Sequence, residues 1–397
     1  MNIALFSVVL AALPLAELLK GLSANGTPPV LQKFRWQLNF AYLMWKSIVP
    51  IRIVLAATLL FLLWRMSPPE RESVAIGGTL LAALWGGIYW LFNHFWIGKH
   101  KFLPLTNPVF TYAADNKVDL AMQVIGVERD GEHKAYPVCM TFYHHQISDT
   151  IANHPILVTY CGMCRSGRVY DASLDGREVR WSLVGAITFN AIFRDQLTGS
   201  WWRQETGEAV KGPLAGRVLA DLPMEQMTLA NWLAKHPDSK VLQYDPKFQQ
   251  RYNFFHSLLS YEASLPGWHM QDTPPLVIGL ECDGQSRAYD WNELKKHQMV
   301  MDRLGNTDLL LLCSSDGTSA FVYDRTCDGE TLEFELRDKV LVDTATRSTW
   351  SQFGLCTDGP RKGAKLVTVQ SYQQFLRAWV SFHANTTFYN FDIVRNQ

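Results

Sequence analysis

Three long apolar runs occupy the first hundred residues of the chain. Ile3–Ala16 and Ile53–Trp64 are apolar, and Val74–Ile97 contains no Asp, Glu, Lys or Arg. Because a helix needs about 20 apolar residues to cross a bilayer, we expect three membrane spans, near residues 3–19, 49–66 and 74–97 of a membrane region that covers residues 1–100. Between the first two spans, Lys33–Trp45 mixes basic, aromatic and apolar residues, which is typical of a helix lying in the membrane interface.

The basic residues around these runs predict an orientation. Arg65 and Arg71 lie between the second and third runs, and more basic residues lie on the other side, namely Lys33, Arg35, Lys46, Lys99 and Lys101. By the positive-inside rule, the large C-terminal region is then cytoplasmic, with a periplasmic location as the alternative. The sequence therefore predicts a multi-pass protein of a bacterial cell membrane, with the lipid bilayer as a partner.

From residue 124 onward, one pattern of apolar and polar positions occurs twice. Val124–Asp171 aligns without a gap with Val277–Asp324, and 16 of the 48 aligned pairs are identical, whereas unrelated segments match at roughly 2 to 4 positions. Further along, Trp232-x-x-x-His236 matches Trp379-x-x-x-His383. We infer a tandem duplication, with a first repeat at residues 110–243, an aromatic linker at 244–274 that we expect to be packed, and a second, degenerate repeat at 275–397.

Each repeat reads as a series of strands closed by one helix. The predicted elements are an opening strand (Met122–Arg129 or Leu276–Cys282), a second strand after an Asp-Gly turn, a buried strand (Ile156–Tyr160 or Leu309–Cys313), a second Asp-Gly hairpin, and a helix (Thr228–Lys235 or Ser371–Phe382). Asp-Gly between apolar segments is a strong hairpin signal. The expected fold class is α+β, with two strand-rich pseudo-symmetric tandem repeats preceded by about three transmembrane helices.

Composition narrows the function classes. The 397 residues are 48% hydrophobic and carry a formal net charge of zero, and no basic stripe is present, so the chain gives no reason to expect nucleic-acid binding. Seven cysteines in a chain of this length do not form a disulfide scaffold, and their odd number leaves at least one thiol outside an intrachain pair.

The duplication separates polar residues that support the fold from candidates for chemistry. His144 and Asp149 recur in the second repeat as His297 and Asp302. One interpretation makes His144 a catalytic base or ligand held by a carboxylate, and the other makes these groups hydrogen-bonding partners at strand ends. Because the second repeat keeps both residues while it lacks the cysteines described next, the sequence favours the structural interpretation.

A Cys-x-x-Cys motif occurs only in the first repeat. Cys161 and Cys164 follow a buried strand and stand opposite Ser314 and Gly317. No helical pattern follows, so a strand-turn-strand metal knuckle fits better than the helix start of a thioredoxin-like pair. Three interpretations stay open: a transition-metal site for zinc, iron or copper with His145 as a third ligand, a redox-active dithiol, or two packed thiols without chemistry.

A second difference between the repeats is cationic. Five charged residues have uncharged counterparts in the second repeat, namely Arg165, Arg168, Arg194, Arg203 and Glu205. If they converge beside the cysteines, they form a site for an anionic small molecule, because arginine offers a planar fork of donors to carboxylate or phosphate. The alternative is an ordinary solvated face.

These segments resemble a known family. Ile156–Tyr170 and Ser200–Gly216 are similar to bacterial and archaeal proteins grouped as domain of unknown function 3179, whose pattern includes His-x-x-x-x-Asp, Thr-Tyr-Cys-x-x-Cys and Trp-x-Gln-x-Thr-Gly. The resemblance covers roughly residues 110–390. Gly162 and Arg165 depart from it, because many relatives have Pro after the first cysteine and Gly after the second. Many relatives look exported, which opposes the orientation given by the charges.

The resemblance implies no activity. Two hypotheses follow for a membrane-anchored protein: a metal-binding or thiol-redox domain acting on an anionic small molecule, with Cys161, Cys164, His144 and Asp149 as catalytic candidates, or a non-enzymatic module that binds a ligand or partner and has structural cysteines. The sequence leaves open whether the protein is an enzyme.

Overall fold

The computed structural model describes residues 2–24, 34, 36–96, 98–260 and 275–391. The chain forms two compact units. One contains the N-terminal helices together with Val179–Gln204 and Glu208–Val218, and the other contains the rest of the chain from Leu105 onward.

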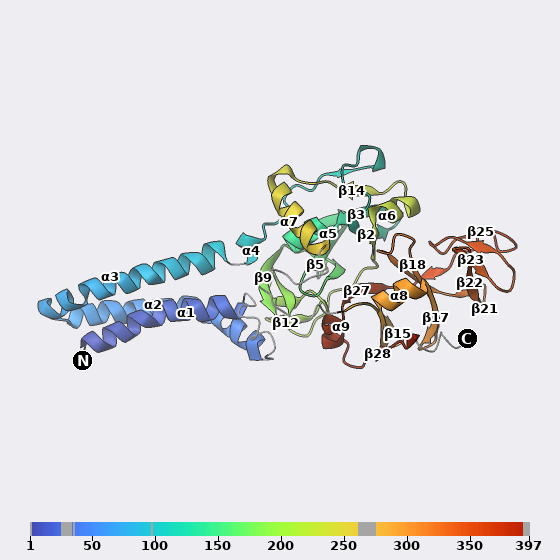
Figure 1. Cartoon of the computed structure of the whole chain (residues 1–397). Coiled ribbons are helices and arrows are strands. Elements are labelled where there is room, and N and C mark those ends of the chain that lie inside the picture. The colour runs from blue at the N-terminus through green and yellow to red at the C-terminus, as the bar shows by residue number, and fades with distance from the viewer. Residues whose placement is uncertain (1, 25–33, 35, 97, 261–274, 392–397) are drawn as a thin grey trace. The chain divides into compact units, whose positions relative to one another are not determined.

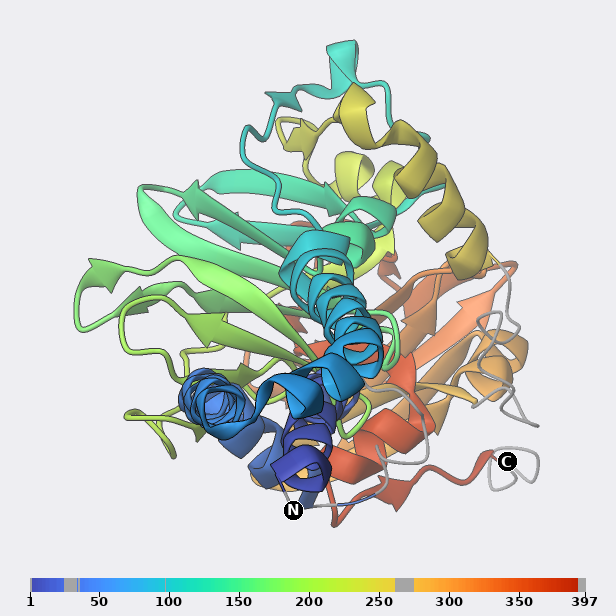
Figure 2. The ribbon, with the colours of Figure 1, turned by 90° about the vertical axis from the view of Figure 1, so that its left-hand side faces the viewer.

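The N-terminal unit begins with three long helices, α1 (Asn2–Ala24), α2 (Trp36–Arg65) and α3 (Pro68–Trp90), the last continued by a π-helical turn, η2 (Leu91–Phe95), and followed by the short α4 (Gly98–Lys101). The long helices lie alongside one another in Figure 1 and are seen nearly end-on in Figure 2. Apolar side chains fill the space between them, among them Phe6, Leu10, Leu62 and Val74. All three are long and apolar enough to cross a membrane, so they fit the predicted membrane association.

The expectation of a separate interfacial helix at Lys33–Trp45 is wrong. The described part of this segment, from Trp36, is the first third of α2, which continues through Pro50 without a break. Its inner face is covered by protein, because Tyr42 and Trp45 both make edge-on ring contacts with the buried Trp201. The mixed composition therefore reflects packing against a sheet of the same unit.

Charged side chains among these helices are paired. Glu17 is fully buried and accepts hydrogen bonds from Arg52 at 2.5 Å and from Asn93 at 3.0 Å, while Lys20 also donates to Asn93. Pairing is expected here, because an isolated charge is costly in an apolar helical environment.

The sheet of the N-terminal unit contains β9 (Trp181–Ile187), β10 (Asn190–Asp195), β11 (Trp201–Arg203) and β12 (Ala209–Lys211). The strands are antiparallel, in the order β12-β11-β10-β9. Val184, Ile187, Ile192 and Trp201 form one apolar cluster with Ala41 of α2.

The second unit contains most of the first repeat. One sheet has the order β1-β14-β3-β2-β13 and another the order β4-β5-β6. The bounds are β1 (Phe110–Thr111), β2 (Gln123–Arg129), β3 (Glu132–Pro137), α5 (Val138–His144), β4 (Gln146–Ile151), β5 (His154–Cys161), β6 (Ser166–Asp171), β7 (Ser173–Leu174), β8 (Arg177–Glu178), β13 (Glu225–Thr228), α6 (Leu229–Lys235) and β14 (Lys240–Leu242).

The second repeat follows in the same unit. Its sheets have the orders β27-β15-β16-β28, β17-β18-β19-β26 and β22-β23-β24-β25. The bounds are β15 (Leu276–Cys282), β16 (Gln285–Asp290), α8 (Trp291–His297), β17 (Met299–Leu304), β18 (Thr307–Cys313), β19 (Ala320–Asp324), β20 (Thr326–Cys327), β21 (Glu330–Thr331), β22 (Phe334–Arg337), β23 (Val340–Asp343), β24 (Thr349–Trp350), β25 (Cys356–Asp358), β26 (Val367–Thr368), β27 (Ser371–Phe375), α9 (Leu376–Phe382) and β28 (Thr387–Phe388).

The two repeats match element by element, which confirms the predicted fold class. Apart from β26, to which only a single bridge between Tyr170 and Asp221 corresponds in the first repeat, both have the same order of strands and short helices along the chain. The sheet β14-β3-β2-β13 has the same connectivity as β28-β16-β15-β27. Side-chain contacts match too, since the Trp202 indole donates to Asp195 at 2.8 Å and the Trp350 indole donates to Asp343 at 3.1 Å. The exact domain boundaries stay a prediction.

Two details of the sequence-based elements need correction. The predicted helix Ser371–Phe382 starts only at Leu376, because Ser371–Phe375 forms β27, which pairs with β15 along its whole length. The short helices α5 and α8 have seven residues each. Two turns are too short to show a helical period, so the sequence analysis did not predict them.

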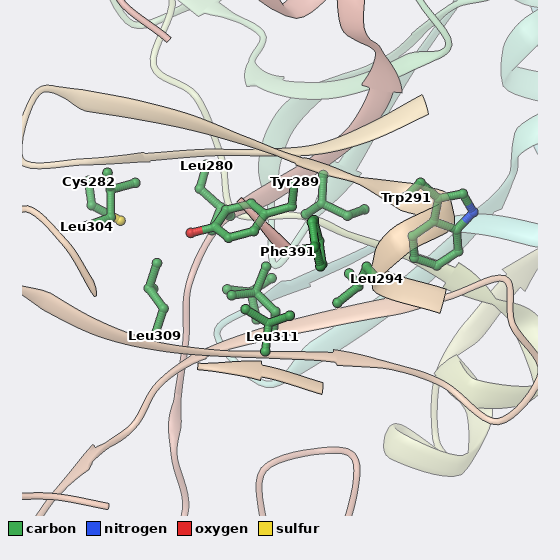
Figure 3. Close-up of a cluster of buried hydrophobic side chains, with 12 residues drawn as sticks. Leu280, Cys282, Tyr289, Trp291, Leu294, Leu304, Leu309, Leu311 and Phe391 are labelled. Carbon is green, nitrogen blue, oxygen red and sulfur yellow. The ribbon is translucent and has the colours of Figure 1, made fainter. Parts of the chain in front are cut away.

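The core of the second repeat lies between two of its sheets. Figure 3 shows Leu280 and Tyr289 facing Leu309 and Leu311, with Leu294 of α8 beside them. This two-layer arrangement is the usual way for a strand-rich unit to bury one face of each sheet.

The described part of the aromatic linker is packed, as predicted. A 3-10 turn, η4 (Pro246–Phe248), leads into α7 (Gln249–Ser260), and Phe248, Tyr252 and Phe255 are buried. Tyr261 and Trp268, which also supported the prediction, lie outside the described residues.

Candidate functional site

The Cys-x-x-Cys motif lies in the tight turn between β5 and β6, as the strand-turn-strand interpretation predicted. Cys161 pairs with Ser166 at the end of the hairpin, and the Cys164 amide donates to the Cys161 carbonyl at 3.2 Å. Both cysteines are buried, with relative exposures of 1% and 0%, and neither forms a disulfide. The turn leads into β6 and not into a helix.

Local packing explains how this turn differs from the family pattern. A Cβ atom on Gly162 would lie 1.9 Å from the Phe142 ring, so a larger residue at this position requires α5 to shift. Arg165 has a left-handed backbone with φ of 53°, a conformation in which glycine is favoured. The backbone conformation of Arg165 therefore costs free energy that a glycine at this position would avoid.

The second repeat completes the surroundings of the thiols. The Phe375 amide, at the start of α9, donates to the Cys164 carbonyl at 2.8 Å, and Arg377 donates to the Met163 carbonyl at 3.3 Å. Burial lowers the pKa of Arg377, and electrostatic interaction with Cys164 and Cys161 opposes that shift. The sequence analysis did not single out Arg377. Its signal was available, because the first repeat has Ala230 at the equivalent position, and the other arginines were selected from such charge differences between the repeats.

An open pocket of about 270 Å³ lies beside the turn. Tyr160 and Arg165 of the first repeat, His256 of α7 and Lys295 of α8 contribute to its wall. Arg165 donates to the Leu259 carbonyl at 2.9 Å. The guanidinium has no carboxylate partner among the described residues. Burial raises the pKa of the Tyr160 hydroxyl, and the Arg165 guanidinium opposes this.

Amide side chains line the same pocket. The Gln226 amide nitrogen donates to Gln123 at 2.6 Å, and Gln123 donates to the Thr318 carbonyl at 2.6 Å. The Gln226 side-chain oxygen is buried and has no hydrogen-bond partner within the described chain. No Asp or Glu lines the pocket in that part of the chain, so its lining combines cations with neutral hydrogen-bonding groups.

Arg168 and Glu205 bind each other. Arg168 donates to Glu205 at 2.7 Å, and Ser166 donates to the other carboxylate oxygen at 2.5 Å. Both side chains are buried, with exposures of 5% and 0%, and the guanidinium lies 3.3 Å from the centre of the Tyr372 ring. The two side chains are paired with each other, although the Arg168 Nε atom is buried without a hydrogen-bond partner among the described residues, and neither residue contributes to the pocket wall.

The other two arginines belong to the N-terminal unit. Arg194 lies on β10 and Arg203 on β11, where Arg203 donates to the Thr188 hydroxyl at 2.9 Å. Their convergence with Arg165 stays a prediction.

The remaining candidates have structural contacts. His144 is buried, with its Nε2 atom 2.8 Å from the Tyr252 hydroxyl. Asp149 accepts hydrogen bonds from Lys134 and Tyr136 at 2.9 and 2.7 Å, and its counterpart Asp302 accepts from Arg287 and Tyr289 at 2.5 and 2.6 Å. These repeated contacts agree with the structural interpretation.

His145, the predicted third metal ligand, ends α5 in a left-handed conformation. Its backbone carbonyl accepts a hydrogen bond from the Tyr160 amide at 3.3 Å. Its role as a ligand of a metal with Cys161 and Cys164 stays a prediction.

A different group in the described chain could hold a metal ion. Glu128, His133 and His236 place one ligand atom each within 4.8 Å of one another. The sequence analysis identified Trp232-x-x-x-His236 as a pattern common to both repeats and assigned His236 no function. The sequence signal for this group was His133, which stands opposite Ser286 in the second repeat. The sequence analysis gave this difference no weight.

Comparison with known proteins gives one match. Residues 101–386 match a protein family described as "Protein of unknown function (DUF3179)". No curated protein and no solved structure matches the chain.

Proposed function

The chain belongs to this family of unknown function, and from its site we propose that it is a membrane-anchored domain that binds an anionic small molecule beside a dithiol. The observation that carries the proposal is the pocket wall, in which Arg165 and Lys295 provide two cations and no described residue provides a carboxylate. A pocket of about 270 Å³ suits a small carboxylate or phosphate compound. The unpartnered Gln226 oxygen favours a ligand that also carries a hydrogen-bond donor.

Replacing Arg165 tests this function. We expect Arg165→Gln to weaken the binding of the preferred anion about 10- to 100-fold, because a hydrogen bond to a charged group contributes about 1.5–3 kcal/mol. The measurement is calorimetric titration of the full-length protein in detergent with phosphate and with small mono- and dicarboxylates. Arg177→Gln is the matched control, since Arg177 is exposed on the β7–β8 hairpin and does not line the pocket. The proposal is contradicted if Arg165→Gln and Arg177→Gln bind the anion with the same affinity.

A second candidate function is reversible thiol chemistry at Cys161 and Cys164. The observation that favours it is Arg377, which donates to the carbonyl of Met163, between the two cysteines, at 3.3 Å, because a neighbouring cation stabilises the thiolate that reacts. Metal binding by Cys161 and Cys164, with His145 as a third ligand, is the alternative to this redox function. Oxidation would form one S–S bond and transfer two electrons and two protons to a disulfide or quinone oxidant.

Thiol counting distinguishes this dithiol from inert cysteines. After incubation of the full-length protein with oxidised glutathione, we expect the wild type to lose two thiols that reductant restores, and Cys161→Ser to lose the intramolecular disulfide. Cys139→Ser is the control, because burial raises the pKa of the Cys139 thiol to about 12 and keeps it protonated. Seven thiols after oxidation, or a metal retained by the wild type and lost from Cys161→Ser, would exclude this redox function.

The orientation in the membrane belongs to the same proposal. We place the repeats in the cytoplasm, because the basic residues Lys46, Lys99 and Lys101 lie on their side of the predicted spans and outnumber Arg65 and Arg71 on the other. A reporter active only in the cytoplasm, fused after Gln397, should give signal, whereas an export-dependent reporter should not. The reverse result would place the pocket in the periplasm, as in the exported relatives.

A further inference from the structure

A cluster of two histidines and one carboxylate lies near the β2–β3 turn of the first-repeat sheet. Glu128 on β2 and His133 on β3 are directly opposite each other in the antiparallel register. His236 follows the last residue of α6, and its ring stacks on that of His133 with centroids 4.2 Å apart. The β2–β3 hairpin and the end of α6, which are distant in sequence, thus bring two imidazoles and a carboxylate together.

The cluster has the geometry of an incomplete coordination sphere. The ligand atoms of all three residues lie within 4.8 Å of one another, and His133 Nε2 lies 3.7 Å from the nearer Glu128 oxygen. Ligands that hold zinc tetrahedrally at about 2.1 Å are themselves about 3.4 Å apart. Small side-chain rotations therefore suffice to close the site on one ion.

His236 gives an independent sign that a ligand belongs here. The side chain is only 8% exposed, and its Nε2 atom is buried without a hydrogen-bond partner among the described residues. A buried imidazole nitrogen without a partner is costly unless a water or an ion satisfies it.

The outer groups also fit a metal. Asp238 lies 3.3 Å from His133 Nδ1 but makes no hydrogen bond to it in this geometry, so a small rotation is needed before this carboxylate can orient a metal-bound histidine. The nearby Lys235 is held by Glu225 at 2.6 Å, which offsets its charge. Glu128 is half exposed, at 54% for its side chain, so an ion can enter from solution.

The second repeat contains a natural counterpart in which the site is missing. Glu281 and His383 occupy the positions of Glu128 and His236, whereas Ser286 replaces His133 in the same cross-strand register. His383 has partners within the protein, since its Nδ1 atom lies 3.0 Å from the Trp379 carbonyl and its Nε2 atom 3.4 Å from Glu281. The fold thus needs the helix-end histidine but does not need a histidine on β3.

We infer that Glu128, His133 and His236 form a binding site for a divalent transition metal of the zinc class. Two imidazoles and one carboxylate are a common donor set for such ions, and they leave a coordination position open for water or an exogenous ligand. The inference is independent of the anion pocket and of the dithiol.

Metal binding to the full-length protein in detergent tests the site. After removal of bound metal with a chelator, equilibrium dialysis against Zn²⁺ followed by elemental analysis should give one equivalent per chain. His133→Ser should lower the affinity at least 100-fold, and Glu128→Gln at least 10-fold. Serine is the natural residue at this position in the second repeat, so the His133→Ser variant should fold, which its far-UV circular dichroism checks.

The matched control is Glu281→Gln, the same change at the equivalent position of the second repeat, and it should leave the affinity unchanged. Zn²⁺ should raise the thermal midpoint of the wild type and of Glu281→Gln, and should not raise that of His133→Ser. The proposal is overturned if the folded His133→Ser variant binds zinc like the wild type, or if the bound equivalent depends on Cys161 and not on His133.

Discussion

Glu205→Ala should lower the free energy of unfolding by about 3 kcal/mol, because it leaves the Arg168 guanidinium buried without its partner. The Arg168 side chain is 5% exposed and its hydrogen bond to Glu205 is 2.7 Å long, so water cannot replace the carboxylate. Asp221 lies 3.9 Å from the guanidinium and keeps part of the attraction, which places the loss at the low end of the range for broken buried pairs.

Denaturation of the full-length protein by urea in detergent, followed by near-UV circular dichroism, measures this loss. Glu178→Ala is the control, since Glu178 is exposed on β8 and a surface substitution should change stability by less than about 0.5 kcal/mol. If Glu205→Ala also lost less than about 0.5 kcal/mol, Arg168 would have to be solvated in the folded protein.

The second repeat indicates how the lost stability can be recovered. At the positions of Arg168 and Glu205 it has Phe321 and Phe353, whose rings meet edge to face with centroids 5.6 Å apart. Well-packed apolar residues often replace a buried ion pair at little cost. The Arg168→Phe/Glu205→Phe double variant should therefore lie within about 1.5 kcal/mol of the wild type, the remaining loss coming from Ser166, which loses its acceptor. Additive losses from the two single variants would contradict this coupling.

This exchange also shows why sequence analysis misjudged part of the site. The duplication correctly separated Arg168 and Glu205 from the residues common to both repeats, but a difference between copies does not reveal where a side chain points. Arg165, three residues before Arg168, lines the pocket, while Arg168 is turned inward to Glu205. Both are arginines that follow the same Cys-x-x-Cys motif. Only the hairpin register and the φ of 53° at Arg165 distinguish them.

The fold was easier to predict than the site because its signals are local. Asp-Gly turns and alternating apolar positions gave β15 with its observed bounds and β2 to within one residue. The site depends on contacts between distant segments, such as Phe375 with Cys164 and Lys295 with the first-repeat wall. No pattern within either segment encodes those contacts. The sequence differences at Arg377 and His133 could therefore be interpreted only once the structure placed these residues.

The paired tryptophans of the closing helices should give the second large effect. Trp232 and Trp379 are both fully buried, and each covers a glycine on the neighbouring strand, since a Cβ atom on Gly126 or Gly279 would lie 2.2 or 2.3 Å from the indole ring. We expect Trp232→Ala and Trp379→Ala each to cost about 3–5 kcal/mol, because neither strand backbone can fill the cavity left behind. Urea denaturation of the full-length protein measures both.

Phenylalanine should distinguish the two tryptophans. The Trp232 indole nitrogen donates to Ser239 at 2.7 Å, whereas the Trp379 indole nitrogen is buried without a partner in the described chain. Trp232→Phe removes a hydrogen bond and leaves a buried hydroxyl with fewer partners, so it should cost about 1 kcal/mol more than Trp379→Phe, which removes an unsatisfied donor. Equal losses would mean that the Trp379 nitrogen is also hydrogen-bonded, for instance through a buried water. Because the repeats share the same helix, strand and glycine, the difference between the two phenylalanine variants isolates that single hydrogen bond.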